Sequence, residues 1–494
     1  MHEPADPRRP RILGGVLTAI RTNPRAWIIA AATAGLVVLG GGSFALGTAI
    51  GAPSAAPAST TPVTAATATP TKTVIPTPPP RPTATPAAPA ARLRTCSVAG
   101  LADDGRLGTF EGQVLNAKTG EVLFDRHGTK PAPTASVMKI LTAAAALATL
   151  GADYRIPTTV VKGSEPGQVV LIGGGDVTLS RTPTGSDPFY KGAAHLDQLA
   201  AQVKKAWSAD PANDGKPITS LVADSSLFSG PVWLPSWDEH EERIVEGSTA
   251  YVTALQVDGD RDDPYVLESS RGTDPVGRAA NAFANDLGGG IRVSKGTAAS
   301  GAKQLGQVLS PTVSTMADQA LTYSDNTIME TLARLVAIKT GSGDTFAAEN
   351  AGTRRGLAPY GISTSGIRVV DGSGLSDLNR VPPSFLTRLM VKILNRQSGL
   401  GMIYDGLPVS GETGTLAAQY GRFQGAASVA RGKINAKTGW INGGYTLAGV
   451  VHSADGTPLT FAVFALGDVD NSAMAAIDSL AAGFYRCGGN LSNN

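Results

Sequence analysis

The sequence predicts a mixed α/β (α+β) fold, in which a largely β insertion splits one folded domain and an N-terminal transmembrane helix precedes it. Three observations lead to this prediction. Residues 26–52 carry no charge, residues 134–151 form an Ala/Leu-rich helical run, and residues 158–310 hold short apolar runs separated by Gly, Asp and Pro. With 494 residues and a net charge of +2, the chain is long enough for two or three domains and gives no indication of a nucleic-acid partner.

The N-terminus has the pattern of a membrane anchor. Residues 1–25 contain five arginines and are predicted to be cytoplasmic, while the uncharged residues 26–52 exceed the roughly 20 apolar residues that span a bilayer. We therefore expect a single-pass protein of the cell membrane with an extracytoplasmic folded part. The run is long for a cleavable signal, and small residues after it (Ala52, Ser54, Ala55 and Ala56) leave cleavage and secretion as the alternative.

Residues 53–91 are rich in Pro, Thr and Ala and are predicted to form a semi-rigid linker, with an extended reach on the order of 120 Å. Globular composition begins near residue 92. Two cysteines, Cys96 and Cys487, lie near the two ends of this folded part. Because domain termini often lie close together, a disulfide is expected in an oxidising compartment, and two separate buried thiols are the alternative.

The predicted elements follow in order. Residues 112–125 read as a hairpin, and residues 134–151 as a helix with Thr134 as its cap and Gly151 as its stop. The insertion at 158–310 divides the domain into 92–157 and 311–490. After it we expect a helical pattern over 313–338 that is interrupted at 323–326, a helix over 384–395, two strands within 433–451, a strand over 459–466 and a closing helix over 473–485.

Ser136 and Lys139 lie on the same face of the predicted helix near its start. A hydroxyl beside an amine in this position is a candidate activated nucleophile. The alternative is a capping serine and a solvated lysine, and the same spacing recurs at Ser300 and Lys303, where no helical pattern exists. The charged stretch 238–243 is interpreted as a solvated loop.

Three short motifs follow one another along the chain: Ser136-Val-Met-Lys139, Ser324-Asp-Asn326 and Lys437-Thr438-Gly439. Lys-Thr-Gly also occurs at 118–120, on a hairpin tip, and at 339–341, at a predicted helix end. Only the copy at 437–439 lies on a strand that leads into a hairpin after both other motifs. This order is that of the penicillin-interacting serine enzymes.

The residue types suit acyl transfer. Ser136 needs a base, and Lys139 serves as one only if desolvation or a neighbouring positive charge such as Lys437 keeps its amine neutral. Ser324 is placed to relay a proton to the leaving amine, and Asn326 to hold Lys139 or the substrate.

Substrate binding is assigned to the third motif and its neighbour. Lys437, Thr438 and Gly439 suit the free carboxylate at the end of a substrate, and the backbone N–H groups of Ser136 and Trp440 are candidates for the oxyanion hole.

The chain resembles the D-alanyl-D-alanine carboxypeptidase/endopeptidase family of low-molecular-mass class C penicillin-binding proteins, peptidase family S13. The gap between the first two motifs, 324 − 136 = 188 residues, leaves room for an inserted domain. Further stretches that match the family lie at 171–180, 371–376, 379–381 and 414–416. The resemblance implies a β-lactamase/penicillin-binding-protein-like αβα serine hydrolase domain split by the insertion. Trp440 departs from the family by being bulkier than the small residue or Thr expected there.

The resemblance implies a serine-type D-Ala-D-Ala carboxypeptidase, with DD-endopeptidase activity also in range, that acts on peptidoglycan stem peptides ending in D-Ala-D-Ala. Ser136 would carry the acyl group, and β-lactams would inhibit by acylating it. We expect no cofactor and no metal, since no His/Cys cluster has metal spacing. Two alternatives are a β-lactamase of the same fold and a catalytically inert cell-wall binding protein.

Overall fold

The computed structural model describes residues 93–493. The predicted cytoplasmic N-terminus, membrane anchor and linker lie outside these residues. Within the described part of the chain, no helix is both long and apolar enough to cross a membrane.

The first sheet joins strands from both ends of the folded part. Its order is β2-β1-β10-β9-β8, and its neighbouring strands are antiparallel. The strands are β1 (Thr109–Asn116), β2 (Val122–Arg126), β8 (Ile434–Ile441), β9 (Gly444–His452) and β10 (Pro458–Leu466). The hairpin predicted within 112–125 and the three late strands are therefore confirmed.

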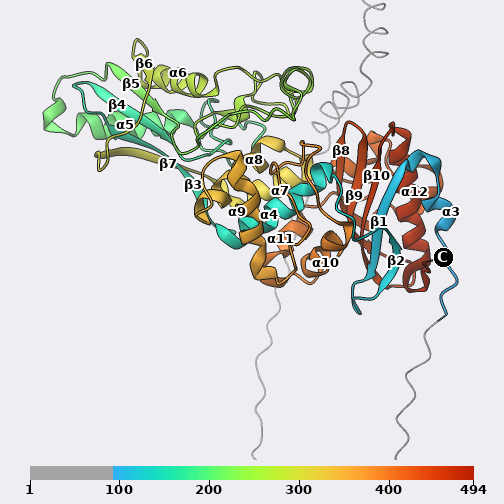
Figure 1. The fold of residues 1–494 in the computed structure, drawn as a ribbon. Helices are drawn as coiled ribbons and strands as arrows, with labels where there is room; N and C mark the ends of the chain where they lie inside the picture. The colour runs from blue at the N-terminus through green and yellow to red at the C-terminus, as the bar shows by residue number, and fades with distance from the viewer. Residues whose placement is uncertain (1–92, 494) are drawn as a thin grey trace, which may run out of the picture. The chain divides into compact units, whose positions relative to one another are not determined.

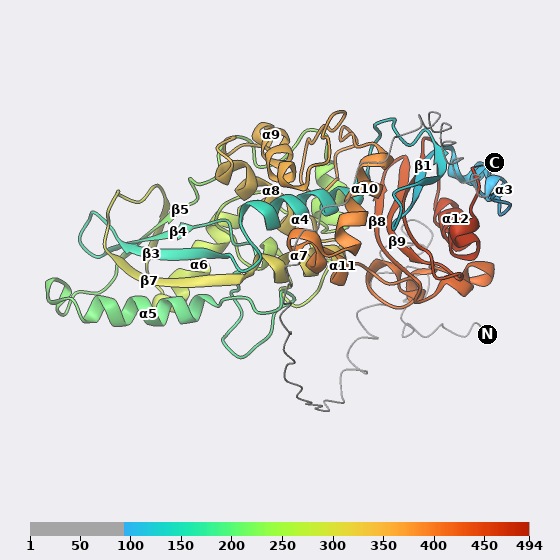
Figure 2. The ribbon, with the colours of Figure 1, turned by 90° about the horizontal axis from the view of Figure 1, so that it is seen from below.

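Helices cover both faces of this sheet. The closing helix α12 (Ser472–Cys487) packs with the short helix α3 (Ala99–Ala102) on one face, and α10 (Pro383–Leu394) packs on the other. Figures 1 and 2 show this helix–sheet–helix layering, which is the αβα architecture that the resemblance implies. The central strands β9 and β10 are mostly apolar because helices cover both faces of the sheet, and all but one residue of β9 are buried.

A helical cluster lies beside α10 and holds the central helix of the molecule, α4 (Met138–Thr149). Every residue of α4 from Met138 to Leu147 is buried, so its Ala-rich composition serves close packing on all sides. The neighbouring helices are α7 (Val313–Tyr323), α8 (Asn326–Lys339), α9 (Phe346–Leu357) and α11 (Gly401–Asp405). The predicted interruption at 323–326 is the junction between α7 and α8.

The insertion forms a second sheet of order β6-β5-β4-β3-β7. Its strands are β3 (Arg155–Lys162), β4 (Gln168–Gly173), β5 (Ser220–Asp224), β6 (Arg292–Lys295) and β7 (Gln304–Thr312). The pairs β4/β5 and β5/β6 are parallel, and parallel neighbours need long crossover connections.

Two helices that the sequence interpretation did not include make these crossovers. They are α5 (Leu196–Ser208) and α6 (Pro275–Leu287), and they pack against each other and the sheet. The buried residues of α5 recur with helical spacing and are Leu196, Leu199, Ala200, Val203 and Trp207. The insertion, predicted as largely β, is therefore an α/β unit in which a five-stranded sheet is joined by two helices.

The two ends of the folded part meet. Cys96 and Cys487 form a disulfide with their Cα atoms 5.4 Å apart. Beside it, Cys96 makes a parallel bridge with Leu491, and its carbonyl accepts from the Ser492 backbone N–H at 2.9 Å.

Candidate active site

The three motifs meet at one cleft of about 310 Å³. The predicted site residues that line it are Ser136, Ser324, Asn326, Thr438, Gly439 and Trp440. Lys139 and Lys437 are fully buried behind the wall and reach the cleft through their amines. The structure thus brings all eight predicted site residues to one place.

Ser136 lies in a 3-10 turn, Ala135–Val137, which precedes α4, and not in the first turn of an α-helix as expected. Thr134 is not a cap: its side chain makes no capping hydrogen bond, and its carbonyl accepts from the Thr446 hydroxyl of β9 at 2.7 Å. Ala135 has a left-handed φ of 47°. Contact with the sheet therefore sets the turn that presents the serine, which local helix propensity could not reveal.

Lys139 donates to three acceptors. Its Nζ lies 2.8 Å from Ser136 Oγ, 2.6 Å from Asn326 Oδ1 and 2.9 Å from the Ser373 carbonyl. Burial lowers the pKa of Lys139 to about 8, and the negative charges of Glu330 and then Asp371 oppose this shift. A neutral fraction of the amine is therefore available near physiological pH to accept the Ser136 proton.

Ser324 links the second motif to the third. It adopts a left-handed φ of 63° between α7 and α8, and its hydroxyl accepts from Lys437 Nζ at 2.9 Å. Burial, then the charges of Lys139 and Arg422, hold the pKa of Lys437 well below its usual range. Burial is the largest cause of the lowered pKa at both lysines, and the repulsion that the sequence suggested adds to it at Lys437.

Gly439 allows strand β8 to lie against the serine turn. A Cβ at this position would lie 2.2 Å from Thr446 Oγ1 and 2.8 Å from the Thr134 carbonyl, so only glycine fits. Next along the strand, Trp440 lines the cleft, and its ring lies 6.4 Å from that of Tyr445. On the other side, the Thr438 and Thr415 hydroxyls are 2.7 Å apart.

A loop at 371–374, for which the sequence offered no chemical role, supports Lys139. The Ser373 carbonyl accepts from Lys139, while the Ser373 backbone N–H donates to Glu330 at 2.6 Å. Gly374 has φ 90°, and a Cβ there would lie 1.9 Å from the Ala135 carbonyl. Glu330 lies one turn after Asn326 on α8, and this i, i+4 spacing is the local signal that could have identified it.

Asp371 organises this loop. Its carboxylate accepts from the backbone N–H groups of Gly374 at 2.8 Å and Ser376 at 2.6 Å, and from the side chains of Asn379 and Trp237, both at 2.8 Å. Four donors on one buried carboxylate explain why the Asp-Gly-Ser-Gly stretch occurs beside an active site: Asp371 folds the loop and does not face the cleft.

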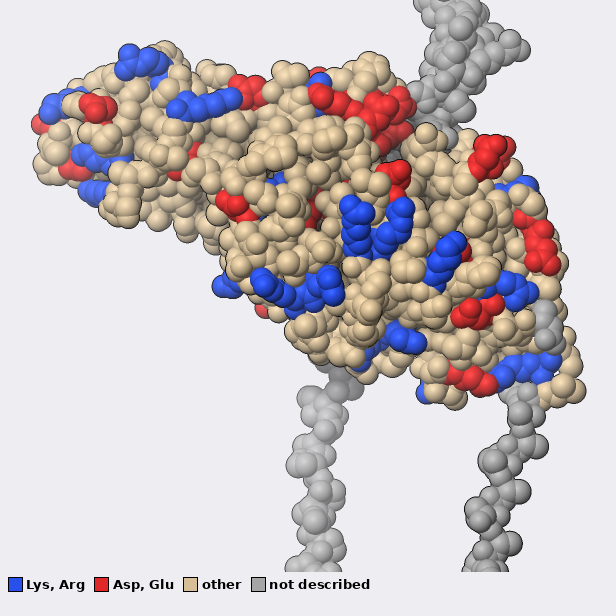
Figure 3. Space-filling model, viewed as in Figure 1, with Lys and Arg blue, Asp and Glu red and all other residues tan. Residues whose placement is uncertain are grey.

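Insertion residues form one wall of the cleft, which sequence reasoning missed. They are Glu242, Glu246, Ser248, Arg261, Leu267, Glu268 and Arg271. The stretch 238–243, interpreted as a solvated loop, is indeed exposed at residues 238–240, but it enters a short π-helix, His240–Val245, whose Arg243 is buried. Burial raises the pKa of Glu242 to about 7 and that of Glu268 to about 8. Figure 3 shows a group of acidic side chains over the part of the insertion that carries this short helix.

Among the described residues, no group of three or more His, Cys, Asp and Glu side chains is arranged to hold a metal ion. The cleft offers a hydroxyl beside an amine of lowered pKa, a second hydroxyl beside a second such amine, and backbone amides.

Comparison with known proteins agrees with this geometry. Carboxypeptidase DacB of Mycolicibacterium smegmatis is 36% identical over 408 residues, which cover 80% of this chain and 84% of that protein. The D-alanyl-D-alanine carboxypeptidase of an Actinomadura species is 26% identical over 455 residues, covering 74% and 79% of the two chains.

Among solved structures, penicillin binding protein 4 of Haemophilus influenzae has the same fold. Its TM-score is 0.63 at 20% identity, and the match covers 78% of this chain and 98% of that one. A structure of that protein complexed with a β-lactam matches with a TM-score of 0.57.

The family comparison covers nearly the whole described part of the chain. The match extends over residues 95–276 and 252–486, so it includes all three motifs and the insertion. Together with the relatives, this shows that the chain belongs to the D-Ala-D-Ala carboxypeptidase 3 (S13) family.

Proposed function

We propose that this chain is a serine-type D-Ala-D-Ala carboxypeptidase in which Ser136 is the nucleophile and Lys139 its base. The observation that carries the assignment is the contact of 2.8 Å between Lys139 Nζ and Ser136 Oγ, at the wall of a cleft that also holds Ser324 and Lys437. The buried amine has a lowered pKa, as a general base must have.

In acylation, Ser136 Oγ attacks the carbonyl carbon between the two D-alanines, and its proton passes to Lys139 Nζ. The C–N bond then breaks, and the leaving amine takes a proton from Ser324 Oγ. Lys437 Nζ, 2.9 Å away, replaces the proton on Ser324. The lowered pKa of Lys437 makes it a stronger acid for this step.

Hydrolysis reverses these transfers. Water occupies the position of the departed amine and attacks the acyl carbon, and its proton returns through Ser324 to Lys437. Lys139 gives its proton back to Ser136 Oγ as the ester bond breaks. Both lysines then regain their starting states, so a full turnover leaves no net proton on the protein.

The substrate ends in a carboxylate, and Lys437, Thr438 and Thr415 offer a charge and two hydroxyls for it. The backbone N–H groups of Ser136 and Trp440 are assigned to the oxyanion. The named relatives support peptidoglycan stem peptides as the substrate class, and the fold shared with a β-lactam complex supports inhibition by β-lactams.

We propose that the same site also cleaves cross-linked peptides as an endopeptidase. The insertion residues that line the cleft, among them Ser248, Arg261 and Arg271, are proposed to contact the longer leaving group of such a substrate. Residues 26–52 are proposed to anchor the chain in the membrane, with the linker extending the enzyme into the cell wall. Membrane fractionation of the full chain and of a chain that lacks residues 1–52 tests this proposal.

The decisive experiment is the intact mass of the full chain with and without benzylpenicillin, beside Ser136→Ala and Ser300→Ala. We expect a stable adduct in the parent and in Ser300→Ala, which alters the second Ser-x-x-Lys copy, and none in Ser136→Ala. D-Alanine release from a D-Ala-D-Ala peptide should follow the same pattern.

Other outcomes would replace the proposal. Rapid destruction of the drug without an adduct would indicate a β-lactamase. An intact drug and no adduct, together with no release of D-alanine, would indicate an inert wall-binding protein.

A further inference from the structure

The insertion contacts both residues that flank Ser324. The Phe189 ring packs edge-on against Tyr323 with centroids 5.4 Å apart. Asp325 Oδ2 accepts from Arg261 Nη2 at 2.9 Å and from the Tyr190 hydroxyl at 3.0 Å. The opposite oxygen of Asp325 caps α8 by accepting from the Ile328 N–H at 2.9 Å.

Arg261 is held rigidly. Its side chain is fully buried, and besides Asp325 it donates to the carbonyls of Asp258 and Leu267, each at 3.0 Å. Its guanidinium also stacks over Tyr190, 4.4 Å from the ring centroid. A guanidinium with three fixed acceptors and a stacking partner has one available position, so Arg261 defines where Asp325 lies.

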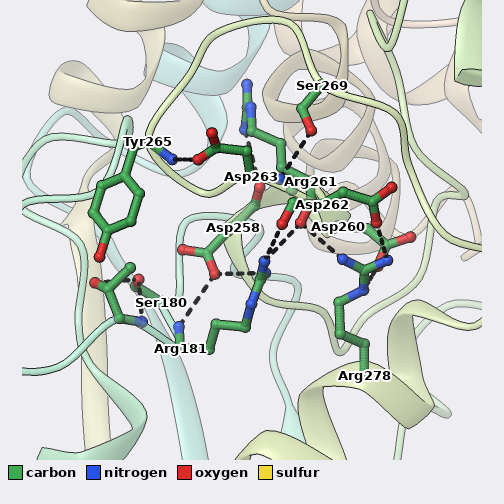
Figure 4. Close-up of polar contacts among 12 residues, drawn as sticks. Ser180, Arg181, Asp258, Asp260, Arg261, Asp262, Asp263, Tyr265, Ser269 and Arg278 are labelled. Atoms are coloured by element: carbon green, nitrogen blue, oxygen red, sulfur yellow. Dashed lines mark hydrogen bonds and ion pairs between the residues drawn. The ribbon is translucent and has the colours of Figure 1, made fainter.

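The loop that carries Arg261 has a strained backbone and is held in place by ion pairs. Asp258, Gly259 and Asp260 have consecutive left-handed φ values of 53°, 60° and 57°. Figure 4 shows the ties: Arg181 pairs with Asp258 at 3.0 Å, and Arg278 pairs with Asp260 at 2.8 Å. Strained backbone of this kind persists where surrounding contacts over-determine it, and it concentrates at functional sites.

We propose that Arg261 is a positioning residue through which the insertion holds Ser324 in place for proton relay. The backbone of Ser324 is itself in the left-handed conformation, which costs free energy for a residue other than glycine. The Arg261–Asp325 contact keeps the turn in this state, and the turn keeps Ser324 Oγ 2.9 Å from Lys437 Nζ. The inference rests on the proposed function and assigns the insertion a part in it.

Arg261 also lines the cleft, so direct contact with substrate is the competing explanation. A double-mutant cycle separates the two. The variants are Arg261→Met, Asp325→Asn and the double variant, measured in the full chain as the rate constant of acylation by benzylpenicillin. Arg261→Met leaves the Asp325 carboxylate buried without its charged partner, which can destabilise that variant by itself. The double variant removes both charges, so it shows whether a slow rate in Arg261→Met comes from such destabilisation.

If Arg261 acts through Asp325, each single variant slows acylation by about thirtyfold or more, and the double variant is no slower than the slower single. For a D-Ala-D-Ala peptide, kcat falls while KM changes by less than about twofold. If Arg261 instead contacts substrate directly, the two effects multiply and KM rises, which overturns the inference.

Two milder variants, each of which loses one buried hydroxyl, test the same inference with less risk of misfolding than the charge-removing variants. Tyr190→Phe removes one hydroxyl from Asp325, and Tyr360→Phe removes a buried hydroxyl that donates to the Ala144 carbonyl at 2.9 Å, away from the motifs. We expect both to lower the melting temperature slightly, and only Tyr190→Phe to slow acylation, by about tenfold. Equal acylation rates in these two variants would overturn the inference.

Acylation of the parent chain by benzylpenicillin distinguishes a failure of the proposed function from a failure of the role proposed for the insertion. A parent that benzylpenicillin does not acylate would refute the proposed function and this inference with it. A parent that is acylated, with rates that do not respond to Arg261→Met or Tyr190→Phe, would refute the role of the insertion alone.

Discussion

The buried amine of Lys139 should make acylation of Ser136 strongly dependent on pH. With a pKa of about 8, roughly one lysine in ten is neutral at pH 7 and roughly one in a hundred at pH 6. Only the neutral amine accepts the serine proton. The rate therefore falls as pH falls below about 8, by up to about tenfold per pH unit.

Neighbouring groups modify this slope. Glu330, Asp371, Asp325 and Glu242 all raise the pKa of Lys139. Burial raises the pKa of Glu330 to about 8 and that of Glu242 to about 7, so both carboxylates become protonated as the pH falls through this range. Their loss of charge lowers the pKa of Lys139 and softens the decline. We therefore expect a loss of between about tenfold and a hundredfold from pH 8 to pH 6.

Stopped-flow measurement of acylation by benzylpenicillin between pH 5.5 and 9.5, at constant ionic strength, tests this expectation. Lys139→Met should lose about 10²- to 10⁴-fold at the plateau. Lys303→Met, which alters the exposed lysine of the second Ser-x-x-Lys copy, should keep the parent profile. A rate that is constant between pH 6 and 8, or a Lys139→Met variant that retains the parent rate, would refute the role of Lys139 as base.

Two further predictions concern the frame of the site. Replacing Cys96 and Cys487 by Ser should lower the free energy of unfolding by up to about 6 kcal/mol in the chain-entropy treatment of a long loop, measured by urea unfolding; an unchanged midpoint would contradict it. Gly374→Ala should slow acylation by more than about tenfold, because its Cβ collides with the Ala135 carbonyl beside the nucleophile. Gly361→Ala, which has a similar left-handed φ and open space around it, is the control, and equal rates in the two variants would contradict the steric argument.

Local signals in the sequence were sufficient for most elements of the catalytic part. The helix break at Ser324 was visible because Ser-Asp-Asn interrupts two apolar periodic runs, and Asp325 indeed caps α8. The hairpin of β8 and β9 has an equally local signal, the Asn-Gly-Gly stretch at 442–444. The order of the three motifs then placed their residues in one site, which the structure brings together.

Features that depend on distant contacts had no such signal. The turn at Ser136 is set by strand β9, about three hundred residues later, so helix propensity misplaced the start of α4. Arg261 reaches Asp325 across 64 residues and follows no motif spacing. Helices α5 and α6 are different, because their apolar periodicity was present in the sequence and was masked by the Gly- and Pro-rich segments around them.

The order of strands in the first sheet has a consequence for how the chain acquires its structure. Strand β1 is paired on one side by β2, its neighbour in sequence, and on the other by β10, which is synthesised more than three hundred residues later. The second sheet is built from one continuous stretch, 155–312, so its paired strands are separated by far fewer residues along the chain than β1 and β10 are. During synthesis from the N-terminus, the insertion can therefore fold first. Until β10 has been synthesised, the hairpin of β1 and β2 has one edge without a partner strand. Ser136 is thus synthesised early, but its site is complete only after strands β8, β9 and β10 have been synthesised and have joined the sheet.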